Sequence, residues 1–539
     1  QLAGDLLPDA SRAQQIASGY NMLLQTTEEG GAQPGEYMVK YAADRVRNVS
    51  EVWLGATMGC AECHNHKYDP FTQRDFYSLG AFFADIQEPA VGGRRHTAMP
   101  SPEQTAKLNE LNAALSAADK AFKEAEAAAK MTEEALKKAA DADKPAAEAA
   151  HKQAVEERDA AKTAADAARK ERDAVQGQIP QSLVSVSGNP HTMRILPRGN
   201  WLDESGAEVV PAVPAFLTQQ AIADRRASRL DLAKWITSPD NPLTARAFAN
   251  RVWKLFYGRG ISRDLNDLGG QGQLPTHPEL LDWLAVEFRE SGWDVKRLVK
   301  LLVTSGTYRQ SSVPTAEQKE KDPTNLWVAR QGRWRLDAEL IRDTALEISG
   351  LLVDSTGGKS VKPYQPAKYW QHLNFPQREW ENGKGDELYR RGLYTFWCRS
   401  FPHPAMTAFD APNREECTAE RARSNTPQQA LVLLNDPVFV EASRAFAERI
   451  ASQPGDDATK LAWAWQSATG RAPTEAERAI LASLLKEQQA RYAKDAESAK
   501  QLLTVGESPT PPNFDPVVLA AWTQVSRTIF NAYETTARF

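Results

Sequence analysis

The chain has few cysteines, no dominant charge of one sign and no long apolar run. Four cysteines in 539 residues do not make a small scaffold held together by disulfide bonds. Lysine and arginine number 65 against 70 aspartates and glutamates, so the net charge of −5 creates no positive field to attract nucleic acid or anionic lipid. No apolar run is long enough to span a bilayer, which argues against a membrane-embedded chain.

The rest of the composition is typical of a globular protein. Hydrophobic residues make up 42% of the chain and charged residues 25%. At about 150 residues per domain, the length predicts three to four domains. The 14 tryptophans outnumber the 7 methionines two to one, which favours rigid aromatic packing in a pocket or in a well-packed core.

An alanine-rich segment at residues 102–180 predicts a long antiparallel helical hairpin. Between positions 101 and 180 there are 26 alanines and one aromatic residue, Phe122, so this segment cannot build a thick core of its own. Apolar residues recur every three or four positions from Leu108 to Ala129, the spacing of a coiled-coil seam. A break at Asp141–Pro145 separates two arms, each about 50 Å long at 1.5 Å per residue.

The remaining segments predict a mainly α-helical protein. Residues 183–187 and 192–196 alternate or are rich in β-branched residues, so we expect a small β element near 183–200. Helical patterns dominate elsewhere, for example over 278–290 and 295–304. The expected organisation is an N-terminal module at 1–101, the hairpin at 102–180, a β-containing linker at 181–226, a helical module at 227–450 and a helical extension at 451–539.

One short motif carries recognisable chemistry. Cys60-Ala61-Glu62-Cys63-His64 has the C-x-x-C-H pattern, in which two thiols can form thioethers to one haem and the next histidine can ligate its iron. Two alternatives stay open: a zinc or iron site that also uses His66, and a bare dithiol or disulfide. If the helix continued past His64, His66 would point about 200° away from it, so we expect His66 in a supporting or surface position.

Sequence stretches around the motif resemble a known family. Residues 26–31, 40–46 and 60–71 are similar to the cytochrome c-like module of large planctomycetal surface or periplasmic proteins. Several later stretches resemble a second, C-terminal module of the same family: 241–246, 250–253, 258–260, 275–284, 305–312, 409–415 and 424–431. The resemblance implies an exported protein with a covalent c-type haem, periplasmic or at the cell surface, whose signal peptide is not in this chain.

The leading hypothesis is therefore an extracytoplasmic c-type cytochrome. It would hold haem c at Cys60 and Cys63, with His64 as the proximal iron ligand, and would exchange electrons with a redox partner protein. Formal candidates for a sixth ligand are Met58, His96, Met99, His191, Met193, His277, His403 and Met406. Haem attachment implies an oxidising compartment, where Cys398 and Cys417 could also form a disulfide.

Two other hypotheses concern the remaining modules. The second hypothesis is a haem-coupled oxidoreductase whose second module binds a polar substrate such as a polysaccharide fragment. Its catalytic candidates are His277, Glu279 and Arg309, the first two for acid and base roles. The alternative is that polar residues such as Arg251, Arg309 and Arg414 tie loops together through hydrogen bonds and carboxylate pairs, and that Thr276 and Ser424 or Asn425 cap helices. The third hypothesis is a structural or assembly protein of the cell surface, in which the hairpin mediates oligomerisation and the cysteines form a metal or disulfide clip.

Overall fold

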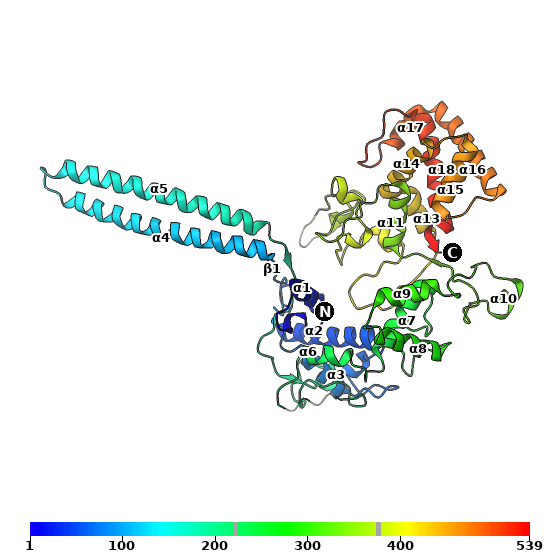
Figure 1. Cartoon of the computed structure of the whole chain (residues 1–539), viewed down its shortest axis with the longest axis horizontal. Coiled ribbons are helices and arrows are strands. Elements are labelled where there is room, and N and C mark those ends of the chain that lie inside the picture. The colour runs from blue at the N-terminus through cyan, green and yellow to red at the C-terminus, as the bar shows by residue number, and fades with distance from the viewer. Residues whose placement is uncertain (220–221, 223, 373–378, 539) are drawn as a thin grey trace. The chain divides into compact units, whose positions relative to one another are not determined.

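The computed structural model describes residues 1–219, 222, 224–372 and 379–538. The chain is mainly α-helical, as the sequence predicts, with short two-stranded β-sheets (Figure 1). It forms two compact units, each assembled from separated stretches. The first contains Gln1–Arg45, Tyr77–Val213 and Gln220–Lys234, and the second contains Val46–Phe76, Pro214–Gln219 and Trp235–Phe539.

Short helices, the long hairpin and two small sheets make up the first unit. Three helices have residues in both units: α2 (Pro34–Asn48), α3 (Gln73–Gly80) and α6 (Arg229–Ile236). The elements wholly inside the first unit are η1 (Gly4–Leu6), α1 (Arg12–Ser18), η2 (Gly19–Met22), η5 (Ala81–Phe83), β1 (Thr97–Ala98), α4 (Pro102–Lys138), α5 (Lys144–Gly177), β2 (Gln181–Ser182), β3 (Met193–Arg194), η6 (Pro197–Gly199) and β4 (Glu208–Val209).

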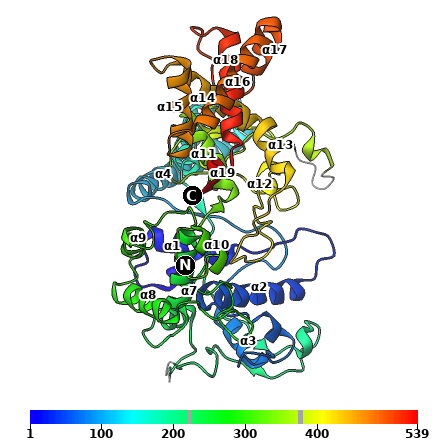
Figure 2. The same ribbon diagram turned by 90° about the vertical axis from the view of Figure 1, so that its right-hand side faces the viewer.

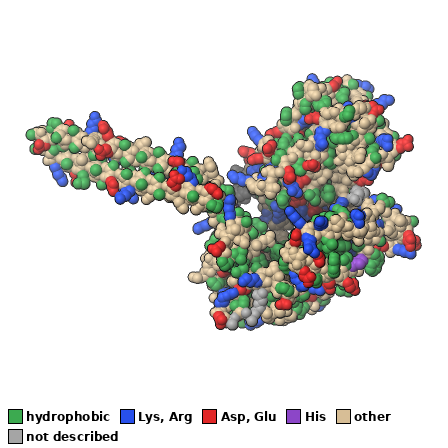
Figure 3. All heavy atoms as spheres, in the orientation of Figure 1, with side chains coloured by type: hydrophobic (Ala, Val, Ile, Leu, Met, Phe, Trp, Pro, Cys, Tyr) green, Lys and Arg blue, Asp and Glu red, His purple; other side chains and the backbone are tan. Residues whose placement is uncertain are grey.

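The alanine-rich segment forms the expected pair of antiparallel helices, α4 and α5 (Figure 1). Ser101 starts α4 with a capping box to Gln104, and Pro102 occupies the first helical position, where its missing N–H costs nothing. Leu111, Leu115 and Ala129 of the predicted stripe are buried. Lysine, arginine, aspartate and glutamate side chains are interspersed over the visible surface of the pair (Figure 3), as expected for solvated helix faces.

Only part of the predicted β element at 183–200 forms strands. The stretch 192–196 contains β3, which pairs with β4 in an antiparallel register of Met193 with Val209. By contrast, residues 183–187 follow β2, the partner of β1, and form only an isolated bridge between Ser187 and Ile86. Backbone hydrogen bonds from Gln87 to Val186 and from Gly188 to Asp85 attach this stretch to residues 85–87 instead.

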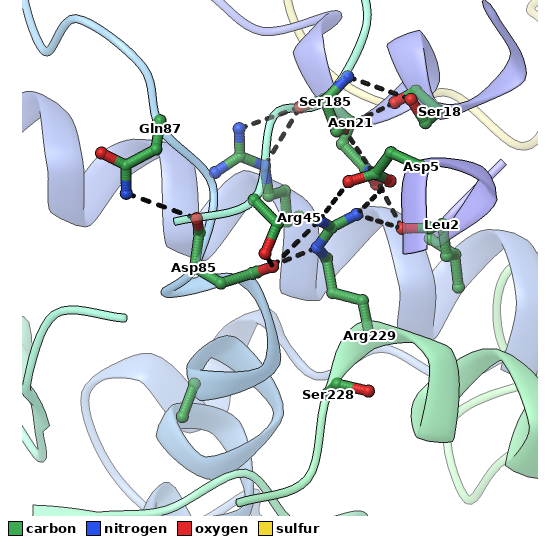
Figure 4. Close-up of polar contacts among 12 residues, drawn as sticks. Leu2, Asp5, Ser18, Asn21, Arg45, Asp85, Gln87, Ser185, Ser228 and Arg229 are labelled. Carbon is green, nitrogen blue, oxygen red and sulfur yellow. Dashed lines mark hydrogen bonds and ion pairs between the residues drawn. The ribbon is translucent and has the colours of Figure 1, made fainter. Parts of the chain in front are cut away.

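A buried polar network holds the N-terminus of the first unit in place (Figure 4). The Arg229 guanidinium, which is fully buried, donates five hydrogen bonds of 2.7–3.0 Å to the carboxylates of Asp5 and Asp85 and to the Leu2 carbonyl. Arg45 makes a bidentate pair with Glu88 at 2.7 and 2.8 Å. These pairs connect η1, the segment after η5 and α6, which are far apart in the sequence.

The second unit contains the remaining helices. Its elements are η3 (Val49–Leu54), η4 (Gly59–Glu62), α7 (Thr244–Tyr257), α8 (Pro278–Glu290), α9 (Val295–Thr304), α10 (Ala316–Lys321), β5 (Trp334–Arg335), α11 (Ala338–Ser349), η7 (Tyr369–His372), η8 (Gly385–Leu388), η9 (Gly392–Tyr394), α12 (Pro404–Ala408), α13 (Pro427–Asn435), α14 (Pro437–Ala451), α15 (Asp457–Thr469), α16 (Glu475–Lys494), α17 (Ala496–Leu503), α18 (Pro516–Phe530), α19 (Tyr533–Thr536) and β6 (Ala537–Arg538). Helices α8 and α9 have the bounds that the sequence predicts.

The C-terminal helices pack around α14 and α18, which lie side by side in both views (Figures 1 and 2). Both helices begin with an aspartate cap followed by proline, at Asp436 and Asp515. The rings of Phe446 and Phe530 stack at 5.6 Å between them. A second apolar core joins α7, α8 and α9, where Trp253 and Tyr257 stack at 3.9 Å. Among the described residues, no helix combines the length and apolarity needed to cross a membrane.

Candidate functional site

The C-x-x-C-H motif lies on a short loop of the second unit. The preceding π-helical turn η3 is followed by Gly55, whose left-handed φ of 59° is accessible to glycine at little cost. An added Cβ there would also lie 3.2 Å from the Cβ of Ala247, so α7 approaches the backbone closely. The chain then turns through the buried Met58 into the 3₁₀ helix η4, which carries the first cysteine.

The three motif side chains are exposed on one turn of this loop. Both cysteines are solvent-exposed, and the backbone N–H groups of Cys63 and His64 donate to the Cys60 carbonyl at 3.3 and 3.4 Å. His64 is exposed as well, and its Nδ1 lies 2.7 Å from the carbonyl oxygen of Asn65. Because a carbonyl oxygen only accepts, Nδ1 carries the proton and Nε2 is the nitrogen with a lone pair.

Two side chains outside the motif, those of Arg47 and Gln73, hold the turn through hydrogen bonds to Glu62. Arg47, on α2, donates from Nη2 to Glu62 Oε2 at 2.5 Å. Gln73 donates from its side chain to the Glu62 carbonyl at 3.1 Å, and its backbone N–H donates to Asn65 Oδ1 at 2.9 Å. The motif is thus held on both sides by residues of α2 and α3.

His66 is buried, which contradicts the surface alternative, while its supporting role stays a prediction. Its Nδ1 accepts a hydrogen bond from the Asp69 backbone at 2.9 Å, and its ring meets Phe71 edge to face. The helical geometry assumed for His66 ends at Glu62, so the 200° argument does not apply to the structure. A buried imidazole engaged with its own loop is a structural element of that loop.

Asp69 anchors the far end of the loop to a glycine pair. Its Oδ1 accepts from the Gly270 N–H at 2.7 Å, and a Cβ on Gly269 would lie 2.6 Å from the same oxygen. Sequence reasoning assigned no role to Asp69, Arg47 or Glu62. The adjacent glycines at 269 and 270 were the available signal, because paired glycines mark a close approach of another group to the backbone.

The donor set fits covalent haem attachment better than a closed metal site. Haem c needs two accessible thiols three residues apart and a histidine whose Nε2 is available, which are the features found at Cys60, Cys63 and His64. A zinc site needs about four converging ligands. Within the described part of the chain, no three His, Cys, Asp or Glu side chains are grouped to hold a metal ion.

The candidate residues of the second module lie far from this loop in the sequence. His277 precedes α8, with Nδ1 3.0 Å from Thr276 Oγ1 and its ring 5.9 Å from that of Trp327. Glu279 and Arg309 are exposed, and Arg309 bonds only weakly to the Ser305 carbonyl, at 3.4 Å. Their catalytic roles stay predictions.

Other polar residues of this module do tie segments together. Arg251 donates to the Glu51 carbonyl at 3.1 Å, and Arg414 lies 3.9 Å from Glu339. Thr276 and Ser424 or Asn425 were the expected helix caps, but they do not occupy the cap positions. His277 and Thr426 directly precede α8 and α13, and neither makes a side-chain cap bond. Ser424 instead donates to the Asp410 carboxylate at 2.8 Å.

A disulfide between the two distal cysteines was one expectation from the sequence. Cys398 and Cys417 are both half-buried, and no disulfide joins them in the part of the chain that the structure describes.

Comparison with known families gives two matches. Residues 1–88 match the family model PSCyt2, described as a protein of unknown function (DUF1549), and residues 228–485 match PSD1, described as a protein of unknown function (DUF1553). The two matched regions are thus similar to the paired domains of a planctomycete-type family, and neither match covers half of the chain. Neither description names a cytochrome or a haem. No curated protein and no solved structure matches the chain.

The compact units do not follow the two family regions. Arg229 and the following residues to Lys234 belong to the second family region but fold into the first unit. Conversely, the C-x-x-C-H loop belongs to the first family region but folds into the second unit, where Asp69 contacts Gly270. Each compact unit therefore contains residues of both family regions.

Proposed function

We propose that this chain is an extracytoplasmic c-type haem protein that transfers electrons to or from a redox partner protein. Haem c would be attached through thioethers at Cys60 and Cys63, with His64 Nε2 as the proximal iron ligand. The observation that carries the proposal is the His64 Nδ1 contact of 2.7 Å with the Asn65 carbonyl, directly beside two exposed thiols. A carbonyl oxygen that accepts from Nδ1 sets the tautomer that a metal-binding histidine needs.

The chain's own residues orient the ligand rather than perform chemistry. Bound haem supplies a one-electron couple. The Arg47–Glu62 pair and the Asp69–Gly270 hydrogen bond fix the two ends of the loop, so that His64 is held in one orientation before the cofactor is attached. Because both thiols face solvent, the attachment reaction has access to them without unfolding of the loop.

The first test is direct detection of covalent haem. The protein would be produced in an oxidising compartment together with a c-type cytochrome maturation system, then examined by intact mass and by spectra before and after dithionite reduction. We expect the added mass of one haem and sharp reduced bands. Cys60→Ala and Cys63→Ala should each remove one thioether, and the double variant should remove covalent haem. Cys398→Ala is the matched control and should retain it.

The histidine assignment has its own pair of variants. His64→Ala should keep the covalent mass but change the reduced spectrum, since an axial ligand is lost. His66→Ala, two residues away, should leave the spectrum of the folded protein unchanged. An unmodified mass and a featureless spectrum for the matured wild-type protein would refute the proposal and leave the motif as a dithiol.

A further inference from the structure

One exposed tryptophan of the second unit stands on a strained loop. The loop covers residues 322–330, between α10 and β5, and the Trp327 side chain within it is 63% exposed. Asn325, two residues before it, and Val328, directly after it, have left-handed φ angles of 54° and 52°. A β-branched residue rarely adopts this conformation, so the loop stores backbone strain next to the tryptophan. The proposed electron transfer uses none of these residues.

Hydrogen bonds from five side chains hold the loop in this conformation. The buried Asp322 carboxylate accepts from the backbone N–H groups of Leu326 and Trp327 at 2.7 and 2.9 Å. Four other side chains donate to backbone carbonyls of the loop: Gln310 to Val328 at 3.2 Å, Gln318 to Ala329 at 3.0 Å, Asn325 to Arg330 at 2.8 Å, and Arg330 to Asp322 and Pro323 at 2.9 and 3.0 Å. These bonds offset the strain and keep Trp327 in one position at the surface.

Exposure by itself says little, because single apolar side chains are common on protein surfaces. Trp283 of α8 is also exposed, at 51%, but it lies on a regular helix with an ordinary backbone conformation. Trp327 combines exposure with a strained backbone that several surrounding side chains maintain. Such maintained strain is typical of positions that bind a ligand.

An imidazole beside the indole supplies a hydrogen-bonding group. The rings of His277 and Trp327 lie 5.9 Å apart and nearly perpendicular, at 81°. The Thr276 hydroxyl donates to the Ile261 carbonyl at 3.3 Å, so its oxygen accepts from His277 Nδ1 at 3.0 Å. This assigns the lone pair to Nε2, to which no residue in the described part of the chain donates. His277 is therefore able to accept from a hydroxyl group of a molecule that lies on the indole.

The charges of the loop are not available to a ligand. Its two charged residues, Asp322 and Arg330, are both buried, and both bond to the backbone of the loop itself. The features left for recognition are one flat aromatic ring and one neutral acceptor. A protein partner would need an interface of roughly 800 Å² on each side, far more than a single indole offers. The combination suits a neutral ligand with a flat apolar face and hydroxyl groups at its edge.

We propose that Trp327 and His277 form a binding site for a neutral chain of β-linked pyranose sugars, such as a β-1,4-glucan or β-1,4-xylan. The ring C–H bonds of these sugars are axial, so each ring has flat apolar faces that pack on the electron-rich face of an indole. Their hydroxyl groups lie around the ring edge, where His277 Nε2 accepts from one of them. The site contains no residue of the C-x-x-C-H motif, so it can be tested with or without haem.

The test is binding of cellohexaose and xylohexaose to the full chain, measured by saturation-transfer NMR. We expect saturable transfer to the ring C–H protons of at least one of the two sugars, since these protons would contact the indole. Hexagalacturonate, an acidic sugar chain, is the charged comparison and should give a weaker signal. No saturable transfer to either neutral sugar, or transfer to the acidic chain alone, would overturn the proposal.

Three variants and a control link the effect to the loop. Trp327→Ala should abolish the transfer, and Trp327→Phe should retain it because an aromatic face remains. His277→Ala should weaken binding about fivefold, the value of one neutral hydrogen bond. Trp283→Ala removes the exposed tryptophan of α8 and should leave binding unchanged. Circular dichroism would verify that each variant is folded, and an undiminished signal from folded Trp327→Ala would refute the assignment.

Discussion

Replacing Arg229 by alanine should destabilise the first unit more than any surface substitution near it. The guanidinium is fully buried and donates five hydrogen bonds, four of them to the carboxylates of Asp5 and Asp85. Burial opposes its charge, yet the two carboxylates outweigh this and raise the pKa of Arg229. Without the arginine, two carboxylates that are only 10% and 15% exposed would face each other with no cation between them.

The expected loss follows from this geometry. Removal of one partner from a buried ion pair costs about 3–5 kcal/mol, because the remaining charge is left uncompensated. That loss corresponds to a decrease of about two to four orders of magnitude in the folded-to-open ratio. It is a large fraction of the stability of an ordinary domain, about 5–15 kcal/mol.

A nearby arginine gives a matched control. Arg225 also makes a bidentate pair, with Asp231 at 2.6 Å for both contacts, but its side chain is 56% exposed. Asp231 is only 9% exposed, but it keeps its hydrogen bonds from the Ser228 N–H and hydroxyl when Arg225 is removed, so Arg225→Ala should cost less than Arg229→Ala.

The assay must report on the first unit alone, because a chain of two units need not unfold in one step. Amide hydrogen exchange measured by mass spectrometry meets this requirement, because peptides covering residues 1–22 and 84–88 report on the first unit. We expect Arg229→Ala to lose protection there, and peptides from α14 and α18 to stay unchanged. A triple variant, Arg229→Met with Asp5→Asn and Asp85→Asn, should recover part of the loss. If Arg229→Ala cost no more than Arg225→Ala, the reasoning would be wrong.

Two further predictions concern the second unit. His403 is buried, with Nε2 donating to the Tyr364 carbonyl at 2.9 Å, and burial lowers its pKa to about 4 from 6.5. The unfolded state then binds more protons between these pH values, so stability should fall by up to about 3 kcal/mol as pH drops from 6.5 to 4. Denaturant titrations at several pH values should show this loss in the wild type and a flatter profile in His403→Gln; equal slopes would contradict the assignment. Asp69→Ala removes the charge-assisted bond from Gly270 and should cost about 2 kcal/mol. Exchange of the residue 60–71 peptide should rise accordingly, and an unchanged rate would show that the glycine pair does not anchor the loop.

Local sequence signals determined several features correctly. The bounds of α8 and α9 follow from Pro278 at the first helical position and from the Asp294 cap, and both signals act within one helical turn. The pair of long helices is predicted by the alanine content of the segment and by the periodic apolar positions, of which Leu111 and Leu115 are buried. The C-x-x-C-H motif is likewise local, because its two thiols and its imidazole lie within five consecutive residues.

Predictions failed where a partner distant in the sequence decided the outcome. Residues 183–187 alternate like a strand, but the nearest backbone partners are at 85–87, so they form a single bridge instead of a hairpin strand. Ser424 looks like a helix cap, yet its hydroxyl is taken by Asp410. The surface alternative for His66 is wrong, since the residue is buried, and the helix assumed for it ends at Glu62.

By itself, the sequence determined that the protein is mainly helical, that one segment forms a long helical pair and that two thiols and a histidine share one short loop. Tertiary structure alone decided what holds these parts in place. Asp5 and Arg229 are 224 positions apart, and Asp69 and Gly270 are 201 apart. Such pairs produce no periodic pattern in the sequence. A hydrogen bond between distant segments depends on the fold of the whole chain and not on the residues adjacent in sequence.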